Sequence, residues 1–535
     1  MPAAPPNLDI LVTRPAGAPV VRDYLQGSPK ALLFFSGHFS DVSAYAAKAS
    51  EVDGRFDRGA RERAVRAMRL PAGGDPGRLR CFVEEGGYVV TTGQQPGLFG
   101  GPLYSLYKGI TTLRLAQALE ARLGKPVLPL FWVASEDHDW AEANHTCIVG
   151  LDNELHCPAL AAPDPEVTPP LHRVPAGPEI KELVERFLQL LPQTDFSEPY
   201  SRLLRESAVP EATLPAAFSR IFEALLGPYG MVFTDAADAT VKEASADLLL
   251  AELDRSEELE RVLMGTASRL ESDGYGVQVT LMEGGVNLFL EGSAGRERLH
   301  REDGGFRLRI SGEYLSPEAV RARRAADPSV LSPTVLLRPV VESAVFPTLS
   351  YVAGPGETAY YAQLADYFQA HGVRMPVIHP RFGATVVEGK IRKVLEKFNL
   401  EVPALGRPFH EIAGEIARDE VPEPVRRALG GLRGAIGKGV GELQDAVKGV
   451  DPTLKGTAQH VRSQAFSALD ELEKKVLQAL KRENEIALSQ LEKAQSELNI
   501  QSADIAKLHG QQKIDAIKEA SEASEKVKEL KPEAD

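Results

Sequence analysis

The chain has 535 residues, of which 43% are hydrophobic and 25% are charged, as in globular proteins and unlike disordered ones. Its 61 Lys and Arg residues are outnumbered by 75 Asp and Glu residues, and the net charge of −14 opposes non-specific nucleic-acid binding, which depends on neutralising phosphates. The sequence shows no secretory signal and no apolar run of about 20 residues, so we expect a cytoplasmic protein that binds neither nucleic acid nor membranes.

The N-terminal third predicts a helical region followed by a βαβ unit. Residues 1–85 are expected to be mostly helical, and a β-branched run over 87–93 predicts a buried strand. Residues 103–122 have helical spacing, with Pro102 suited to the first turn and Gly124 to the C-cap. A second buried strand follows over 126–134. Strand, helix and strand in this order predict a parallel sheet that is covered on both faces.

The middle of the chain predicts more core elements and one different module. A loop over 158–178 precedes helices over 179–226, a strand over 230–236 and helices over 240–272. Alternating runs at 274–292 and 304–310, separated by glycine turns, predict antiparallel hairpins inserted into the α/β body. Residues 348–382 return to strand, glycine turn, helix and strand.

Beyond residue 386 the pattern is almost entirely helical. The glycine-rich stretch from Gly430 to Gly441 predicts a linker between helices, and apolar positions over 465–498 favour an antiparallel or dimeric coiled coil. The charged tail after Ser502 is expected to fray. The predicted organisation is a core in 1–157 and 331–390, an inserted region in 158–330 and a helical dimerisation region in 391–535.

The cysteines do not suggest a disulfide framework. Cys81, Cys147 and Cys157 are few and lack C-x-x-C spacing, so we expect them to be buried as small hydrophobic residues.

A first motif, over residues 91–109, reads TTGQQPGLFGGPLYSLYKG. It follows a predicted strand and opens a helix, where free backbone N–H groups and the helix dipole favour anions. The candidate anion- or substrate-binding residues are Gly93, Gln94, Gln95, Gly97 and Lys108. The alternative is a glycine turn required only for packing.

A second motif, over residues 131–145, reads FWVASEDHDWAEANH. Ligands of open α/β sheets bind beyond the carboxyl ends of strands, which is where Glu136, Asp137, His138 and Asp139 fall. We expect His138 to be a general base oriented by a neighbouring carboxylate, with all four residues as catalytic candidates and Asn144 as a substrate contact. The alternatives are a divalent-ion site that includes His145, or a solvated loop with a helix-capping aspartate; we assign no metal ligands.

A third motif, YVAGPGETAYYAQL, fits the relaxed G-x-G-x-x-[GA] pattern between a strand and a helix. The next strand ends in His379 and Arg381 rather than an acid, which favours an anionic ligand over NAD. We therefore add Gly354, Gly356, Glu357, Tyr360, His379 and Arg381 to the candidate binding residues. Arg338 is a further candidate, as the partner of a carboxylate or as an ordinary surface arginine.

Together the three motifs closely resemble those of the bacillithiol biosynthesis cysteine-adding enzymes, over residues 35–490. The resemblance implies a Rossmann-like core related to class I aminoacyl-tRNA synthetases, two connecting insertions and a coiled coil that makes a homodimer. The implied activity is ligation of L-cysteine to glucosaminyl malate, the last step in making bacillithiol.

The energy source for such a ligation is not visible in the sequence. Class I relatives activate carboxylates with ATP and magnesium, so ATP or ADP with Mg²⁺ is a candidate cofactor, but neither H-x-G-H nor K-M-S-K-S occurs in the chain. Two alternatives therefore stay open: a nucleotide-binding dimeric scaffold, and a nucleotidylyltransferase that acts on another carboxylate.

Overall fold

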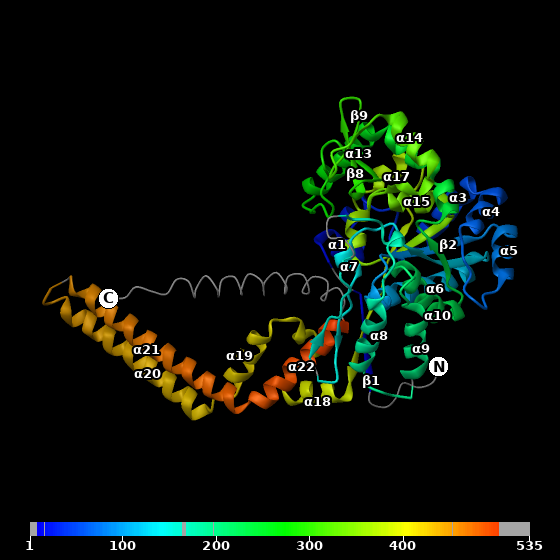
Figure 1. The fold of residues 1–535 in the computed structure, drawn as a ribbon. Helices are drawn as coiled ribbons and strands as arrows, with labels where there is room; N and C mark the ends of the chain where they lie inside the picture. Colours follow the sequence, from blue (N-terminus) through cyan, green and yellow to red (C-terminus); the bar gives the residue numbers. More distant parts are fainter. Residues whose placement is uncertain are drawn as a thin grey trace. The chain divides into compact units, whose positions relative to one another are not determined.

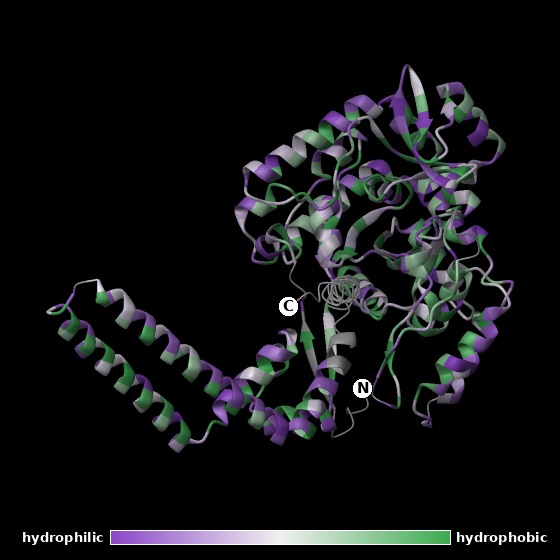
Figure 2. Cartoon of the chain, turned by 60° about the vertical axis from the view of Figure 1, so that its left-hand side comes forward, coloured by the Kyte–Doolittle hydropathy of each residue, from purple (hydrophilic) through white to green (hydrophobic). Residues whose placement is uncertain are grey.

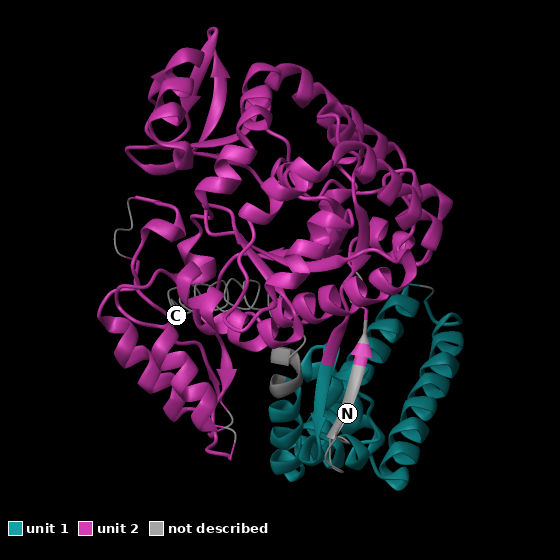
Figure 3. Ribbon diagram, turned by 90° about the vertical axis from the view of Figure 1, so that its right-hand side faces the viewer, with its two compact units in different colours: residues 1–11, 385–535 teal, residues 12–384 magenta. Residues whose placement is uncertain are grey.

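The computed structural model describes residues 8–14, 17–152, 154–162, 167–195, 197–451 and 453–501. The predicted fraying after Ser502 lies outside these residues. The chain forms two compact units, one of residues 12–384 and one of residues 1–11 with 385–535 (Figure 3).

A five-stranded parallel sheet forms the centre of the larger unit, in the order β13-β12-β2-β3-β6. Its strands are β2 (Tyr88–Gln94), β3 (Val127–Val133), β6 (Val232–Asp235), β12 (Thr348–Ala353) and β13 (Val377–Pro380). Because both faces are covered, β3 and β12 are buried along their whole length, which explains their continuous apolar runs. The predicted parallel α/β core is confirmed, and β6 joins it although it lies within 158–330, the range expected to be inserted.

Helices pack around this sheet and contribute to the main apolar core. They are α1 (Pro19–Leu25), α2 (Pro29–Leu32), α3 (Val42–Arg55), α4 (Arg58–Arg66), α5 (Pro76–Glu84), α6 (Tyr104–Leu123), α15 (Arg338–Val345), α16 (Pro355–Tyr361) and α17 (Ala365–Ala370). The crossover helix α6 ends at Gly124, which takes the left-handed conformation expected of a C-cap (φ 64°). It begins at Tyr104, so Pro102 precedes the helix rather than lying in its first turn.

A second apolar cluster lies beside β3 under a group of helices. These are α8 (Glu179–Gln189), α9 (Ser197–Ser207) and α10 (Leu214–Leu226), as predicted for 179–226. The short strands β4 (Ile148–Val149) and β5 (Leu155–His156) form an antiparallel hairpin. This hairpin brings Cys147 and Cys157 to a Cα separation of 4.2 Å, and they form a disulfide. The expectation of three buried thiols is therefore wrong, because strand pairing places two of them side by side; Cys81 is free.

A five-stranded sheet, in the order β10-β9-β8-β7-β11, confirms the predicted antiparallel hairpins. Its strands are β7 (Gly285–Gly292), β8 (Gly295–Glu302), β9 (Gly305–Leu308), β10 (Tyr314–Leu315) and β11 (Leu331–Pro333). The neighbouring helices are α11 (Ala239–Ala244), α12 (Ala246–Asp254), α13 (Ser256–Ser272) and α14 (Pro317–Ala326), of which Figure 1 labels α13 and α14. Residues 274–284 are not in a strand, so the first hairpin starts later than expected.

The smaller unit is largely helical. Its helices are α18 (Gly389–Lys397), α19 (Phe409–Asp419), α20 (Glu423–Val447), α21 (Leu454–Glu483) and α22 (Glu485–Gln501). Two strands cross the boundary between the units and pair with each other, β1 (Leu8–Thr13) and β14 (Gly383–Glu388).

Short 3-10 helices lie in both units. They are at Leu98–Gly100, Leu171–Arg173, Gly227–Tyr229 and Pro328–Val330 in the larger unit and at Val402–Gly406 in the smaller one.

The predicted coiled coil is an antiparallel pair of long helices within one chain, α20 and α21 (Figure 1). Arg433 pairs with Asp470, and Gln444, eleven residues after Arg433, hydrogen-bonds Gln459, eleven residues before Asp470. Hydrophobic and hydrophilic residues alternate along both helices (Figure 2). The linker predicted over 430–441 is wrong, because α20 is continuous there: packing against α21 offsets the roughly 0.5–1 kcal/mol that each helical glycine costs.

The apolar pattern over 465–498 does not form one continuous seam. It is divided at Asn484, where α21 ends and α22 begins. Leu488, Leu491 and Ala494 of α22 instead join a small core with residues of α18 and α19. No helix among the described residues is long and apolar enough to cross a membrane.

Candidate functional site

The three motifs follow three adjacent strands of the parallel sheet. The first motif follows β2, the second β3 and the third β12, and β2 pairs with both of the others. Because the carboxyl ends of parallel strands meet at one edge, the motifs gather there, where open α/β sheets bind ligands.

A buried ion pair joins the first motif to the third. Lys108 of α6 has a side chain only 2% exposed, and its Nζ lies 2.7 Å from Glu357 Oε2. The same Nζ donates to the Gly93 carbonyl oxygen at 2.5 Å and to Gln94 Oε1 at 3.3 Å. Burial lowers the pKa of Lys108, and Glu357 acts in the opposite direction. The protein therefore supplies the partners of this cation itself.

The glycine turn after β12 binds its own glutamate. The N–H of Gly354, the N-cap of α16, donates to Glu357 Oε2 at 2.8 Å, and the Tyr351 hydroxyl donates to Oε1 at 2.5 Å. Burial acts to raise the pKa of Glu357, but Lys108 and the Gly354 N–H hold it below its ordinary value. The backbone donor that a nucleotide fingerprint offers to phosphate is thus used by a carboxylate of the chain. Gly356 lies inside α16 beside open space.

A second buried ion pair lies next to the first. Arg338 Nη1 is 2.8 Å from Glu342 Oε2, and its Nη2 donates to the Tyr360 hydroxyl at 3.4 Å. The Thr91 hydroxyl of β2 donates a short hydrogen bond to the same Glu342. Burial raises the pKa of Glu342, although Arg338 and Thr91 act to lower it. Arg338 is therefore an interior residue with a carboxylate partner and not a surface arginine.

The loop between β2 and α6 is held by its glutamines and a close backbone approach. Gln94 Nε2 donates to the Tyr104 hydroxyl at 3.2 Å, and Gln95 Nε2 donates to the Asp139 carbonyl oxygen at 3.0 Å. The second bond ties the first motif to the second. A Cβ at Gly97 would collide with the Gly101 carbonyl oxygen, so this position requires glycine for packing.

Polar side chains of the second motif bind the local backbone. Asp137 Oδ1 accepts from the next two backbone N–H groups at 2.7 and 3.2 Å. Asp139 is the N-cap of α7 (Trp140–Ala143) and accepts a backbone N–H at 2.9 Å. Asn144 Nδ2 donates to the Leu160 carbonyl oxygen at 2.7 Å. These three side chains shape the loop, as the capping alternative for the motif describes.

Glu136 is buried against a lysine that the sequence analysis did not single out. Its carboxylate forms a close ion pair with Lys242 of α11, which also donates to the Leu331 carbonyl oxygen of β11 at 2.8 Å. Burial lowers the pKa of Lys242 well below its ordinary value. This pair fastens the end of β3 to the antiparallel sheet.

Among the four catalytic candidates of the second motif, His138 is the one whose side chain is partly open to solvent and makes no hydrogen bond to the backbone of the described residues. Its side chain is 29% exposed, and its Nδ1 lies 3.1 Å from Arg296 Nη1 of β8. The nearest carboxylate oxygen, Asp137 Oδ1, is 3.8 Å from Nδ1, beyond hydrogen-bonding distance. Burial and then Arg296 lower the pKa of His138, while Asp137 and Asp139 act to raise it. The predicted orienting carboxylate is therefore replaced by an arginine.

The two candidates after β13 lie in different surroundings. Arg381 packs against Gly354, and its guanidinium lies 5.3 Å from the centre of the Tyr104 ring, so it joins the cluster around Lys108. His379 Nδ1 instead lies 3.1 Å from the Tyr45 hydroxyl of α3. Burial lowers the pKa of His379 to about 4. His379 is thus a partly buried histidine that is neutral near pH 7.

The charged partners Arg296, Lys242 and Glu342 had no motif to reveal them. Arg296 meets His138 across 158 residues of chain, and Lys242 meets Glu136 across 106. The local sequences of Arg296 and Lys242 show only a charged residue on a strand or a helix, and no spacing rule could have found them. Glu342 instead lies four residues after Arg338, which is the spacing at which charged residues pair on a helix.

The described residues support neither the alternative of a divalent-ion site with His145 nor a nucleotide site at the turn after β12. Within the described ranges, no group of three or more His, Cys, Asp or Glu residues is placed to hold a metal ion. His145 Nδ1 lies 3.0 Å from the Ala141 carbonyl oxygen and so acts as a donor there. Because Glu357 occupies the Gly354 N–H and neutralises Lys108, these residues do not fit a phosphate cradle for ATP or ADP.

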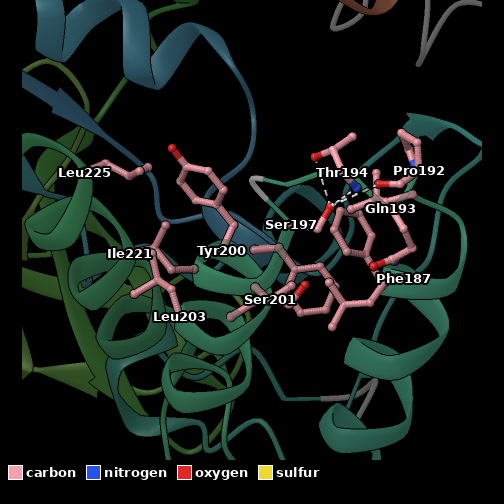
Figure 4. Close-up of a pocket in the computed structure, with 14 residues that line it drawn as sticks. Phe187, Pro192, Gln193, Thr194, Ser197, Tyr200, Ser201, Leu203, Ile221 and Leu225 are labelled. Atoms are coloured by element: carbon pink, nitrogen blue, oxygen red, sulfur yellow. Dashed lines mark hydrogen bonds between the residues drawn. The ribbon is translucent and has the colours of Figure 1, made fainter.

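An apolar pocket of about 390 Å³ lies apart from the charged clusters, between α8, α9 and α10. Figure 4 shows the rings of Phe187 and Tyr200 and the side chain of Ile221 in its wall. None of the predicted site residues lines it. It offers packing surface and no charged group, which makes it a poor candidate for the chemistry of the motifs.

Comparison with known families matches both parts of the chain. Residues 8–382 match the model described as "Bacillithiol biosynthesis BshC, N-terminal Rossmann-like domain". Residues 384–499 match "Bacillithiol biosynthesis BshC, C-terminal coiled-coil domain".

Curated relatives agree with these matches. A protein of Salinibacter ruber named "Putative cysteine ligase BshC" is 33% identical over 412 residues, covering 77% of this chain and 75% of the relative. Relatives of the same name from Symbiobacterium thermophilum and Koribacter versatilis are 32% and 30% identical; they cover 77% and 87% of this chain, and 76% and 86% of their own length. The chain therefore belongs to the bacillithiol biosynthesis BshC family.

Proposed function

We propose that this protein is a cysteine ligase that forms an amide between the carboxyl group of L-cysteine and the amine of glucosaminyl malate. The proposal is supported by the names of the relatives and by the three motifs at one sheet edge. The observation that carries it is His138, a half-buried ring after the end of β3 whose side chain is 29% exposed. A side chain so placed can contact a small ligand.

The reaction requires an activated carboxyl group, and the assay must show where the activation comes from. Joining a carboxylate to an ammonium group releases water and is unfavourable near pH 7, so the cysteine carboxyl needs prior activation. The turn after β12 does not fit a phosphate cradle, so we route no step through a nucleotide. We infer that the Lys108–Glu357 and Arg338–Glu342 pairs fix the ends of β2 and β12 at this sheet edge.

Mass spectrometry of the purified protein with cysteine and glucosaminyl malate tests the proposal. The assay is run with and without ATP and Mg²⁺, and we expect the cysteinyl amide of glucosaminyl malate in at least one arm. Product only with ATP would establish a nucleotide-dependent ligase. Product without ATP would point to an already activated cysteine donor. No product in either arm, with nucleotide binding retained, would favour the dimeric scaffold instead.

We also propose that the chain forms a homodimer through α20 and α21. Leu432 and Leu443 are half-exposed and lie eleven residues apart, three turns along α20, and Val461 and Leu472 have the same spacing on α21. These residues make an apolar stripe on each helix that a second copy can cover. Light scattering should give twice the chain mass of 58.0 kDa, and a Leu472→Glu variant should give the mass of one chain.

A further inference from the structure

Arg296 reaches from the antiparallel sheet to the ring of His138. Its Nη1 lies 3.1 Å from His138 Nδ1. A guanidinium carries only hydrogen-bond donors, so Nδ1 is the acceptor of this bond and cannot hold a proton. The proton of the neutral ring then lies on Nε2.

We propose that Arg296 is a positioning residue that fixes His138 in the Nε2–H form, so that the ring offers an N–H donor to an anionic oxygen of the ligand. The inference rests on the proposed function only for the identity of that oxygen, which belongs to a carboxylate or a phosphoryl group. It replaces the hypothesis that His138 is a general base, because the basic nitrogen faces Arg296 and not the solvent.

The antiparallel sheet holds the arginine rigidly. Arg296 Nε donates to Ser332 Oγ at 2.8 Å and Nη2 donates to the Pro333 carbonyl oxygen at 2.9 Å, both on β11. Its guanidinium lies 4.0 Å from the centre of the Phe289 ring of β7. The guanidinium is therefore fixed by β7 and β11 before any ligand arrives, which is the arrangement that a positioning group requires.

Burial and Arg296 of β8 lower the pKa of His138 and so favour a neutral ring, whereas Asp137 and Asp139 of its own loop act to raise this pKa. A second ring proton, on Nδ1, would point at the guanidinium. The His138 ring also packs edge-on against Phe289 at 5.3 Å. No residue in the described ranges makes a hydrogen bond to Nε2, so this donor is available to a ligand.

Nitrogen NMR of the full-length protein, with ¹⁵N in the histidine rings, tests the proposal without an activity assay. The His138 signals are assigned by their loss in a His138→Gln variant. At pH 7 we expect a neutral ring with the proton on Nε2. In Arg296→Met the ring should no longer hold one form, and it should become charged at a higher pH than in the unmodified protein.

The matched control is Arg298→Met on the same strand. Arg298 donates to the Val286 carbonyl oxygen and to Asn287 Oδ1, so its loss should leave the His138 signals unchanged. If Arg296→Met fails to fold, Arg296→Lys keeps one donor and should keep the proton on Nε2. A proton on Nδ1 in the unmodified protein, or the same signals in Arg296→Met, would overturn the proposal.

Addition of malate or of inorganic phosphate identifies the oxygen that His138 contacts. A shift of the Nε2 signal with malate points to a carboxylate, and a shift with phosphate points to a phosphoryl group. No shift with either would overturn the donor role.

In Arg296→Met, turnover should fall roughly 10–100-fold, as is usual when the group that orients a site side chain is lost. A protein that makes no amide but keeps the Nε2–H signal contradicts the proposed function alone.

Discussion

Two groups of charged side chains at the same sheet edge differ in where their partners come from. Around Lys108 every strong partner is internal: Glu357, Gly93 and Gln94 surround the amine in the interior. Around His138, Nδ1 has a partner in Arg296, the ring is 29% exposed, and Nε2 has no hydrogen-bond partner among the described residues. Both groups follow core strands, so position at a strand end does not by itself identify the residue that contacts the ligand. An atom that has no hydrogen-bond partner within the protein can contact a ligand, and this difference favours His138.

The largest effect on stability should come from breaking the ion pair of Lys108, whose partners all lie within the protein. Lys108→Met leaves Glu357 buried without its cation, and we expect the free energy of unfolding in urea to fall by about 3–5 kcal/mol. The double variant Lys108→Met/Glu357→Gln removes the charge as well and should recover part of the loss. Lys438→Met is the control, since Lys438 is exposed near Glu442 and should change stability little. Equal stability of Lys108→Met and Lys438→Met would contradict a structural role for the buried pair.

Loss of the His138 side chain should have the opposite result, with a large effect on activity and a small one on stability. His138→Ala should lower kcat/KM on the order of 10²–10³-fold, as loss of one donor to a developing charge does in other enzymes. Its unfolding midpoint should barely move, because the side chain is partly exposed. His156→Ala removes a histidine that pairs with Asp152 in the neighbouring hairpin, and turnover should not change. Unchanged turnover in His138→Ala would remove this residue from the site.

A third expectation separates His379 from His138. His379 has a pKa of about 4 in the folded protein because it is buried, against about 6.5 when unfolded. The unfolded chain therefore binds a proton that the folded one does not, and stability falls as the pH drops from about 6.5 to about 4. The loss attributable to this residue is about 3 kcal/mol. His379→Gln should flatten the stability curve in this window relative to the unmodified protein, and a curve of the same slope would place the ring outside the core.

The smallest effect is expected for an exposed ion pair in the long hairpin. Arg433 of α20 pairs with Asp470 and Glu473 of α21, and all three side chains are largely exposed. Arg433→Met should cost about 0–1 kcal/mol in urea unfolding, less at high salt. A loss as large as that of Lys108→Met would show that exposure does not separate these two kinds of pair.

The strands of the core were predictable because their signal is local. A run of buried apolar residues such as those of β3 and β12 can form only where a sheet is covered on both faces. Gly124 could be predicted as a C-cap for the same reason, since a left-handed residue at a helix end favours glycine. The continuous α20 was missed because glycine weakens helices locally, while the neighbouring α21 stabilises this one.

The sequence by itself determined the order of the strands of the parallel core and of the helices that connect them, the three motifs and the family to which they belong. Only the tertiary structure decided which motif residues are closed off and which can meet a ligand. It brought Arg296 to His138 and Lys242 to Glu136, and it joined Cys147 to Cys157 across a hairpin. The physical reason is one of range. Hydrophobic periodicity and capping act over a few residues, whereas the partner of a buried charge is set by the packing of segments far apart in the chain.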